Sequence, residues 1–296
     1  MAQRFDAGRG TLNGPGLPLL SLASRGDRAM QAQFSVSQTG VLAFRPVPEG
    51  RLSTLTWLDR QGKPAGTVGG IADYSNPAFS PDEKRLAVCV RDLKTGKREI
   101  RIHDLVRSTT SRLTFDPSDN LNPYWSPDGT LIYFTSDRKG KRDIYFKSAA
   151  KTGEDQLLLE FSEAINVEHL SPDGKYLLFN TLRNPKPQEL WLLPLGGSQR
   201  TPKLLLSGPY SVIQGQFSPD GKWIAYHSQE SGSDEVFVQP FPPNGKKWQV
   251  STAGGVEPQW RGDGKELFYY SGTEVMAVDV QTKGEDLEFG FPLKDH

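Results

Sequence analysis

A tandem repeat of 43 to 47 residues constrains the fold of this 296-residue chain more than any other feature. Its clearest copy is YWSPDGTLIYFTSDRKGKRDIYF, from Tyr124 to Phe146: an aromatic pair, a Ser-Pro-Asp-Gly turn, an apolar run, a polar loop and a second apolar run. Pro127 sets a negative φ at the first turn position, and Gly129 supplies the positive φ that ends a three-residue hairpin. The unit is therefore predicted to be strand, turn, strand, loop, strand.

The leading apolar residue of the unit recurs six times, at Phe34, Phe79, Trp125, Leu170, Phe217 and Trp260. Each copy continues with an apolar second strand, and five copies open the third strand with a carboxylate: Glu99, Asp143, Glu189, Glu235 and Glu274. A fixed period in the forties with several short strands per repeat is typical of β-propellers. We therefore expect an all-β, six-bladed propeller whose blades contain four antiparallel strands.

The two ends of the chain resemble each other. Met1-Ala-Gln-Arg-Phe-Asp leads to GLPLL from Gly16, and Met276-Ala-Val-Asp-Val-Gln leads to GFPL from Gly290. Residues 1–33 are therefore expected to be N-terminal strands and a connector, an extra half-blade left from a preceding blade. We expect these strands to pack beside the last blade or to form an incomplete one. Residues 34–296 are expected to form the propeller domain.

The hairpin pattern, an aromatic residue followed by Ser-Pro-Asp-Gly and then by Asp or Glu before an apolar pair, resembles the TolB-type or WD-like propeller repeat. Four stretches resemble more closely the C-terminal propeller of bacterial serine/threonine protein kinases: QFSVSQTGVLAF from Gln33, LTWLDRQGKPAGTVG from Leu55, DYSNPAFSPDEKRLAV from Asp73 and EPQWRGDGKELFYYSGTEVMAVDV from Glu257. This resemblance implies a sensing or binding domain, in a periplasmic or other extracytoplasmic location. The sequence itself contains no kinase motif.

Composition argues against several classes of partner. Lys and Arg number 35 and Asp and Glu number 35, so the net charge is zero and no global field attracts nucleic acid. No run approaches the roughly 20 apolar residues of a membrane helix, so direct membrane insertion of this chain is not expected. Cys89 is the only cysteine, which excludes an intrachain disulfide, and a buried, unreactive thiol is expected.

Motifs for catalysis, metal or cofactor binding are not apparent in the sequence. There is no Gly-x-Ser-x-Gly elbow, and the four histidines, His103, His169, His227 and His296, lack zinc-site spacing. We expect no cofactor and no metal. The repeated third-strand carboxylates are interpreted as caps for loop N–H groups or as partners of nearby Arg and Lys.

The residues just before each leading aromatic are candidates for the mouth of the central channel. They form a polar set with two acids and a histidine: Gln31, Asn76, Asn122, Glu168, His169, Gln214 and Glu257, with Gln33, Tyr124, Gln216 and Gln259 close by in sequence. One interpretation is a wetted channel wall. The other is a site for a polar ligand or a peptide, in which Glu168, His169 and Glu257 supply charge.

Three functions are compatible with this pattern. The first is a non-catalytic propeller that binds a protein, a peptide or a small polar ligand, as the sensing part of a kinase-linked protein. The second is a TolB-like periplasmic scaffold of an envelope complex. The third is a propeller hydrolase or lyase that uses the channel histidine and acids.

Overall fold

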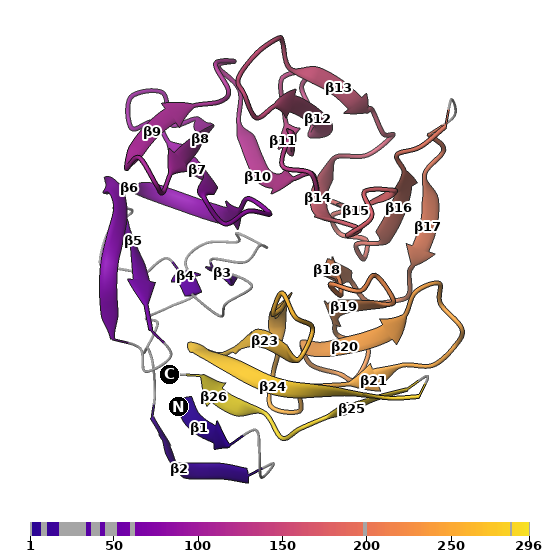
Figure 1. Cartoon of the computed structure of the whole chain (residues 1–296). Coiled ribbons are helices and arrows are strands. Elements are labelled where there is room, and N and C mark those ends of the chain that lie inside the picture. Colours follow the sequence, from indigo (N-terminus) through magenta and orange to yellow (C-terminus); the bar gives the residue numbers. More distant parts are fainter. Residues whose placement is uncertain are drawn as a thin grey trace.

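The computed structural model describes residues 2–6, 11–17, 34–36, 42–44, 52–59, 63–197, 200–284 and 286–295, and every regular element in these ranges is a β-strand. Side chains are described for 52–59, 63–197, 200–284 and 286–292. The sheets lie radially around a central axis (Figure 1). The expectation of an all-β propeller is therefore confirmed.

Three blades have four antiparallel strands each, in sequence order from the axis outwards. They are β10 (Asn120–Trp125), β11 (Leu131–Ser136), β12 (Asp143–Ser148) and β13 (Gln156–Leu159); β14 (Ile165–Leu170), β15 (Tyr176–Thr181), β16 (Leu190–Pro194) and β17 (Lys203–Leu206); and β18 (Val212–Phe217), β19 (Trp223–Ser228), β20 (Glu235–Pro240) and β21 (Trp248–Gln249).

The last blade has five strands: β22 (Val256–Trp260), β23 (Glu266–Ser271), β24 (Glu274–Lys283) and β25 (Asp286–Phe289), with β26 (Leu293–Asp295) paired to β24. The N-terminal strands β1 (Ala2–Asp6) and β2 (Thr11–Leu17) form a two-stranded sheet of their own, beside β26 (Figure 1).

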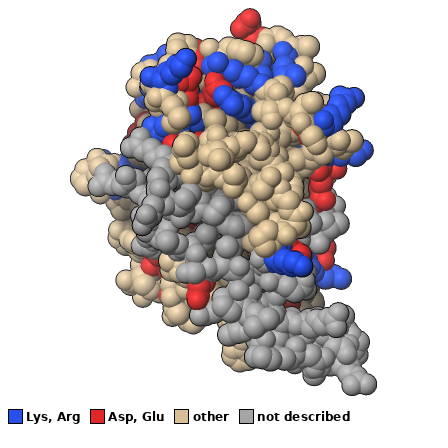
Figure 2. All heavy atoms as spheres, turned by 90° about the vertical axis from the view of Figure 1, so that its left-hand side faces the viewer, with Lys and Arg blue, Asp and Glu red and all other residues tan. Residues whose placement is uncertain are grey.

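The first blade has seven strands: β3 (Phe34–Val36), β4 (Leu42–Phe44), β5 (Ser53–Leu58), β6 (Pro64–Phe79), β7 (Arg85–Arg91), β8 (Arg98–Asp104) and β9 (Thr109–Arg112). Figure 2 shows the side of the molecule on which this blade lies. In this view Lys and Arg gather at the upper edge with Asp and Glu among them, and an area of described uncharged residues lies directly below. The described part of this face therefore presents both signs of charge side by side.

The prediction of six separate four-stranded blades is wrong, because the propeller has five. The first part of β6, from Pro64 to Ala72, pairs with β5, and its second part, from Asp73 to Phe79, pairs with β7. The first two repeat units therefore share one continuous strand. Elsewhere a connecting segment separates the outer strand of one unit from the inner strand of the next, for example 113–119. Ile71-Ala72-Asp73 has no Gly or Pro to end the strand.

The Ser-Pro-Asp turns are held by a repeated set of hydrogen bonds. In four units the Ser hydroxyl donates to the Asp carboxylate two residues later, at 2.5 to 2.6 Å. The same hydroxyl accepts the N–H of the residue that opens the second strand, at 2.9 to 3.0 Å. The serines are Ser80, Ser126, Ser171 and Ser218. The turn motif thus fixes the register of each inner hairpin.

The turns also connect neighbouring blades. A Cβ added to Gly129 would lie 3.6 Å from Cδ of Pro81 in the preceding turn, and Gly174 lies in the same way against Pro127. The indole of Trp125 donates to the carbonyl of Ala78 in the preceding inner strand, at 3.0 Å. The turn glycine therefore permits the positive φ of the turn, and each turn lies within ordinary van der Waals distance of the preceding one.

Four of the third-strand carboxylates have the structural partners predicted for them, and this interpretation is confirmed. Glu99 pairs with Arg101 and Arg112, Asp143 with Lys141, Glu189 with Arg183, and Glu235 accepts from the Ser251 hydroxyl and the Gly254 N–H. Cys89 is fully buried, and burial raises the pKa of its thiol to about 12.

The turn hydrogen bonds give a prediction for Ser171. Replacing Ser171 with Ala removes the acceptor of the Tyr176 N–H and the donor to Asp173. We expect the free energy of unfolding to fall by about 1 to 3 kcal/mol, because the N–H loses its partner at a partly buried turn. Chemical denaturation measures this. Ser231→Ala, at an exposed loop serine, is the control and should stay within about 0.5 kcal/mol of the wild type. Equal effects of both substitutions would contradict this account of the turn.

Candidate functional site

A β-bulge interrupts five of the inner strands at the axis, whereas the short strand β3 pairs with β4 without one. β6, β10, β14, β18 and β22 each have one more residue than the second strand opposite them. The residues in the bulges are the ones that the sequence placed at the channel mouth: Asn76, Asn122, Glu168, Gln214 and Glu257. Side chains along a strand point alternately to its two faces, and a bulge turns one side chain away from that pattern. These polar side chains therefore do not lie on either face of their sheet.

Four of the bulge residues have a positive φ, although none is glycine: Asn76 (53°), Asn122 (57°), Gln214 (58°) and Glu257 (58°). This conformation costs about 1 kcal/mol or more for each such residue. Pro77, Pro123 and Pro258 follow three of them, and Gly215 follows the fourth. Proline lacks an N–H and fits where the ladder of hydrogen bonds is already broken. Repeated backbone strain of this kind is typical of functional sites.

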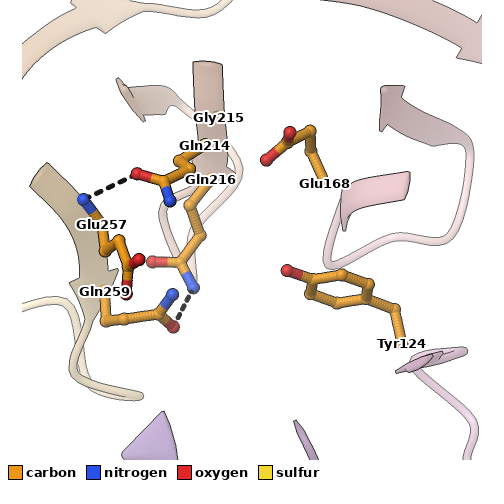
Figure 3. A pocket seen from close by; sticks show the side chains of 7 residues that line it. All are labelled: Tyr124, Glu168, Gln214, Gly215, Gln216, Glu257 and Gln259. Atoms are coloured by element: carbon orange, nitrogen blue, oxygen red, sulfur yellow. Dashed lines mark hydrogen bonds between the residues drawn. The ribbon is translucent and has the colours of Figure 1, made fainter. Parts of the chain in front are cut away.

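Side chains from β10, β14, β18 and β22 line a small pocket at the axis, which has room for about one water molecule (Figure 3). Its lining residues are Tyr124, Glu168, Gln214, Gly215, Gln216, Glu257 and Gln259. All of them except Gly215 are among the polar residues that the sequence placed near the channel mouth. A Cβ at Gly215 would lie 2.7 Å from a methyl group of Leu190, so the Leu190 side chain would have to move to accommodate it.

Hydrogen bonds across the pocket join neighbouring blades. The side-chain oxygen of Gln214 accepts the N–H of Glu257 at 2.8 Å, and the N–H of Gln214 in turn donates to the carboxyl group of Glu168. Gln216 donates to the Gln259 side chain at 2.8 Å (Figure 3). Gln216 also accepts the Trp260 N–H at 2.6 Å. The pocket wall is therefore tied together from β14 to β22.

The residues that line the pocket are acidic or neutral. Glu168 is 4% exposed, and burial together with the nearby Glu257 carboxylate raises the pKa of Glu168 well above its usual value, against the hydrogen bond from Gln214. Burial also raises the pKa of the Tyr124 hydroxyl, and both glutamates add to this. The seven lining residues include no Lys, Arg or His. The pocket thus offers hydroxyl, amide and carboxyl groups without a compensating cation.

The other predicted site residues lie elsewhere. His169 is not among the lining residues; its Nδ1 accepts the Phe217 N–H at 3.3 Å, its ring packs edge-on against Tyr124, and burial lowers its pKa to about 4. Asn76 and Asn122 occupy equivalent bulges but do not line the pocket. Gln31 lies outside the described residues. The structure therefore brings together Glu168, Gln214 and Glu257 from the predicted set.

In the described ranges, no group of three or more His, Cys, Asp or Glu side chains is arranged to hold a metal ion. Within the same part of the chain, no helix is long and apolar enough to cross a membrane.

Comparison with known proteins agrees with this fold. The family model described as "PD40: TolB beta propeller domain" matches residues 65–188. The chain is 32% identical over 103 residues to the Tol-Pal system protein TolB of Desulfosudis oleivorans, which covers 35% of this chain and 23% of that protein. It is 23% identical over 212 residues to the uncharacterized peptidase YuxL of Bacillus subtilis, covering 58% of this chain and 32% of that protein. The chain thus spans a third or less of these relatives.

Among solved structures, TolB from Acinetobacter baumannii matches with a TM-score of 0.66 and 23% identity, over 85% of this chain and 65% of that one. Oligogalacturonate lyase from Vibrio parahaemolyticus matches with a TM-score of 0.60 and 14% identity, over 88% and 76%. The fold is therefore a TolB-like β-propeller. The finer resemblance to kinase-linked propellers stays a prediction.

The pKa of Glu168 gives a prediction about stability and pH. Because its folded-state pKa lies above the unfolded value near 4.5, its contribution is complete below that pH and is lost as the pH rises through the folded-state pKa. We expect the urea midpoint of the wild type to fall between pH 5 and pH 8, and that of Glu168→Gln to fall less.

Glu154 is exposed, so Glu154→Gln is the matched control and should keep the wild-type pH dependence. The interpretation of Glu168 as a buried acid is refuted if Glu168→Gln and the wild type lose the same stability over this range.

Proposed function

We propose that this chain is a binding module whose axial pocket binds a polar group of a partner protein, of a peptide or of a small polar ligand. The bulges support this most directly: five inner strands place a polar residue off the ladder at the axis, and four do so at a positive φ. Three of the five bulge residues line one pocket, and two of these, Gln214 and Glu257, have a positive φ. Backbone strain of this kind clusters at functional sites.

We further propose that the module is part of a longer, extracytoplasmic protein. The resemblance to kinase-linked propellers supports a sensing role in such a protein. The second candidate is a scaffold of an envelope complex, and the match to the TolB propeller model over residues 65–188 favours it. In both cases the propeller recognises a partner without changing it.

A catalytic role is the third candidate, since YuxL is named a peptidase and one structural neighbour is a lyase. The geometry of the pocket supports it less. His169 packs between β14 and β18 with its Nδ1 engaged by the Phe217 N–H, so it is not placed as a base at the pocket. Burial favours the neutral form of Glu168, which suits a hydrogen-bond donor to a bound group.

A peptide selected from a displayed library against the wild-type chain tests this proposal. Binding should weaken at least about tenfold in Glu257→Gln and in Gln216→Ala, because both substitutions change groups that line the pocket. Lys203→Ala, at an exposed position on the outer strand β17, should bind like the wild type. Calorimetry measures the affinities, and mass spectrometry of the peptide after incubation measures turnover.

Selected peptides that bind the two pocket variants as tightly as the wild type would place recognition on another surface. Cleaved peptide after incubation with the wild type, but not with Glu257→Ala or His169→Ala, would replace the binding function with the catalytic one.

A further inference from the structure

Two arginine side chains lie at the end of the propeller opposite the Ser-Pro-Asp turns. Arg98 and Arg142 each come directly before the third-strand carboxylate of their unit, where the third strand begins beside the end of the second. The N–H of Arg98 donates to Asp119, just before β10, at 2.9 Å, and the carbonyl of Arg142 accepts the N–H of Ile165, which begins β14, at 3.0 Å. Each arginine therefore lies beside the inner strand of the following blade, near the axis (Figure 1).

Neither guanidinium has an ion pair within the described part of the chain. Arg98 makes no side-chain hydrogen bond there: its Nε is buried without a partner, and its two Nη nitrogens reach the surface. Arg142 makes one long hydrogen bond, from Nη1 to the Oδ1 of Asn166 at 3.4 Å. Burial lowers the pKa of the Arg142 guanidinium, Asp119 and Asp137 act against this, and the positive charge of Arg98 adds to it. Two half-buried like charges without a direct counter-ion cost free energy, which a bound anion would offset.

The fold itself does not require a cation at this position of the repeat. In the next three blades the equivalent residues are Gln188, Asp234 and Thr273, and none of them is basic. The Gln188 side chain is held within its own blade, where it accepts a hydrogen bond from the amide of Asn180. The unpaired arginines are therefore confined to two neighbouring blades, which is expected of a local site and not of a general packing role.

The charges around the two arginines set the charge of a suitable ligand. Lys97 pairs with both Asp119 and Asp137, at 3.5 Å each, and the Asp137 carboxylate accepts the Asp119 N–H at 2.8 Å. Three cations and two carboxylates leave one positive charge in this group. A single carboxylate balances that charge, whereas a phosphate group at pH 7 carries more negative charge than the group can balance.

We propose that Arg98 and Arg142 together bind a carboxylate group of a ligand at this end of the axis. Arg98 donates from its Nη nitrogens, and Arg142 donates from the nitrogens that Asn166 does not engage. The planar fork of a guanidinium suits contact with both oxygens of a carboxylate. The amide nitrogen of Asn166, next to Arg142, makes no hydrogen bond to the described residues and adds a neutral donor. None of these residues lines the axial pocket, so the site is a second recognition surface and does not depend on the proposed function.

The tripeptide acetyl-Gly-Glu-Gly-amide is the probe, and its glutamine analogue, which keeps the shape and loses the charge, is the matched ligand control. Titration at constant ionic strength is followed through the arginine Nε–H signals of the ¹⁵N-labelled protein. We expect the glutamate peptide to shift the Arg98 signal and to bind at least about tenfold more tightly than the glutamine peptide. Equal binding of both peptides, or no shift of the Arg98 signal, would overturn the proposal.

Two further ligands define the chemistry and the source of the bound group. Propionate carries the same carboxylate without a polypeptide. Tighter binding of the glutamate peptide than of propionate would assign the site to an acidic side chain of a partner, and equal or tighter binding of propionate would assign it to a small carboxylate; both outcomes support the site. Inorganic phosphate should bind more weakly than either. Phosphate that binds more tightly than both carboxylates would contradict the charge assigned to the ligand.

Charge variants test the same site within the protein. Arg98→Gln and Arg142→Gln should each weaken binding of the glutamate peptide at least about tenfold, because each removes a charged donor. Arg107→Gln, at an exposed position on the turn after β8, is the matched control and should bind like the wild type. Asp137→Asn leaves both arginines in place and keeps an oxygen for the Asp119 N–H, and it should strengthen binding about threefold because a like charge is removed. Affinity that is unchanged in Arg98→Gln, Arg142→Gln and Asp137→Asn would refute the assignment.

Discussion

The structure depends on hydrogen bonds that join the inner strands of neighbouring blades across the axis. Between separate blades there is no strand ladder, so contact near the axis is made by side chains. Gln214 shows how this works: its side chain accepts the N–H of Glu257 in the next blade, while its own N–H donates to Glu168 in the preceding one. At the β18 and β22 bulges an N–H is freed from its ladder, and a side chain of the preceding blade accepts it. The ring is therefore closed, in this part, by the same residues that line the pocket.

This arrangement explains why strain and polarity occur together. A positive φ at Gln214 and Glu257 is unfavourable in isolation, but the inter-blade hydrogen bonds and the turn contacts hold both residues in place. The result is a pocket wall with a buried acid, Glu168, and none of the described lining residues supplies a cation to balance its carboxyl group. Preorganised polar groups of this kind reduce the entropy that a ligand loses on binding. The binding function proposed for the pocket follows from this preorganisation.

The fold class could be predicted from the sequence because a single repeat unit contains the turn motif and the apolar segments on either side of it. These features indicate the strand order and the core positions. The predicted number of blades was wrong because every repeat unit was assumed to begin a new sheet. Ile71-Ala72-Asp73 instead continues β6 from the first unit into the second. The pocket residues could be named because they stand at a fixed distance before each leading aromatic. Their positive φ was not predicted: asparagine tolerates this conformation, but Gln214 and Glu257 are of residue types that rarely adopt it.

Other features could not be read from the sequence. Glu168 and His169 are adjacent in sequence, and both were candidates for the channel. The register of the β14 bulge decides that Glu168, and not His169, lines the pocket.

Hydrogen exchange at the Glu257 amide tests the central claim most directly. This N–H lies outside its own ladder, so its protection depends on the Gln214 side chain. In the wild type we predict slow exchange at Glu257, and in Gln214→Ala we predict faster exchange at Glu257 with unchanged exchange at Val238, a ladder position within the neighbouring blade. Rapid exchange at Glu257 in the wild type, or equal protection in both proteins, would contradict the account.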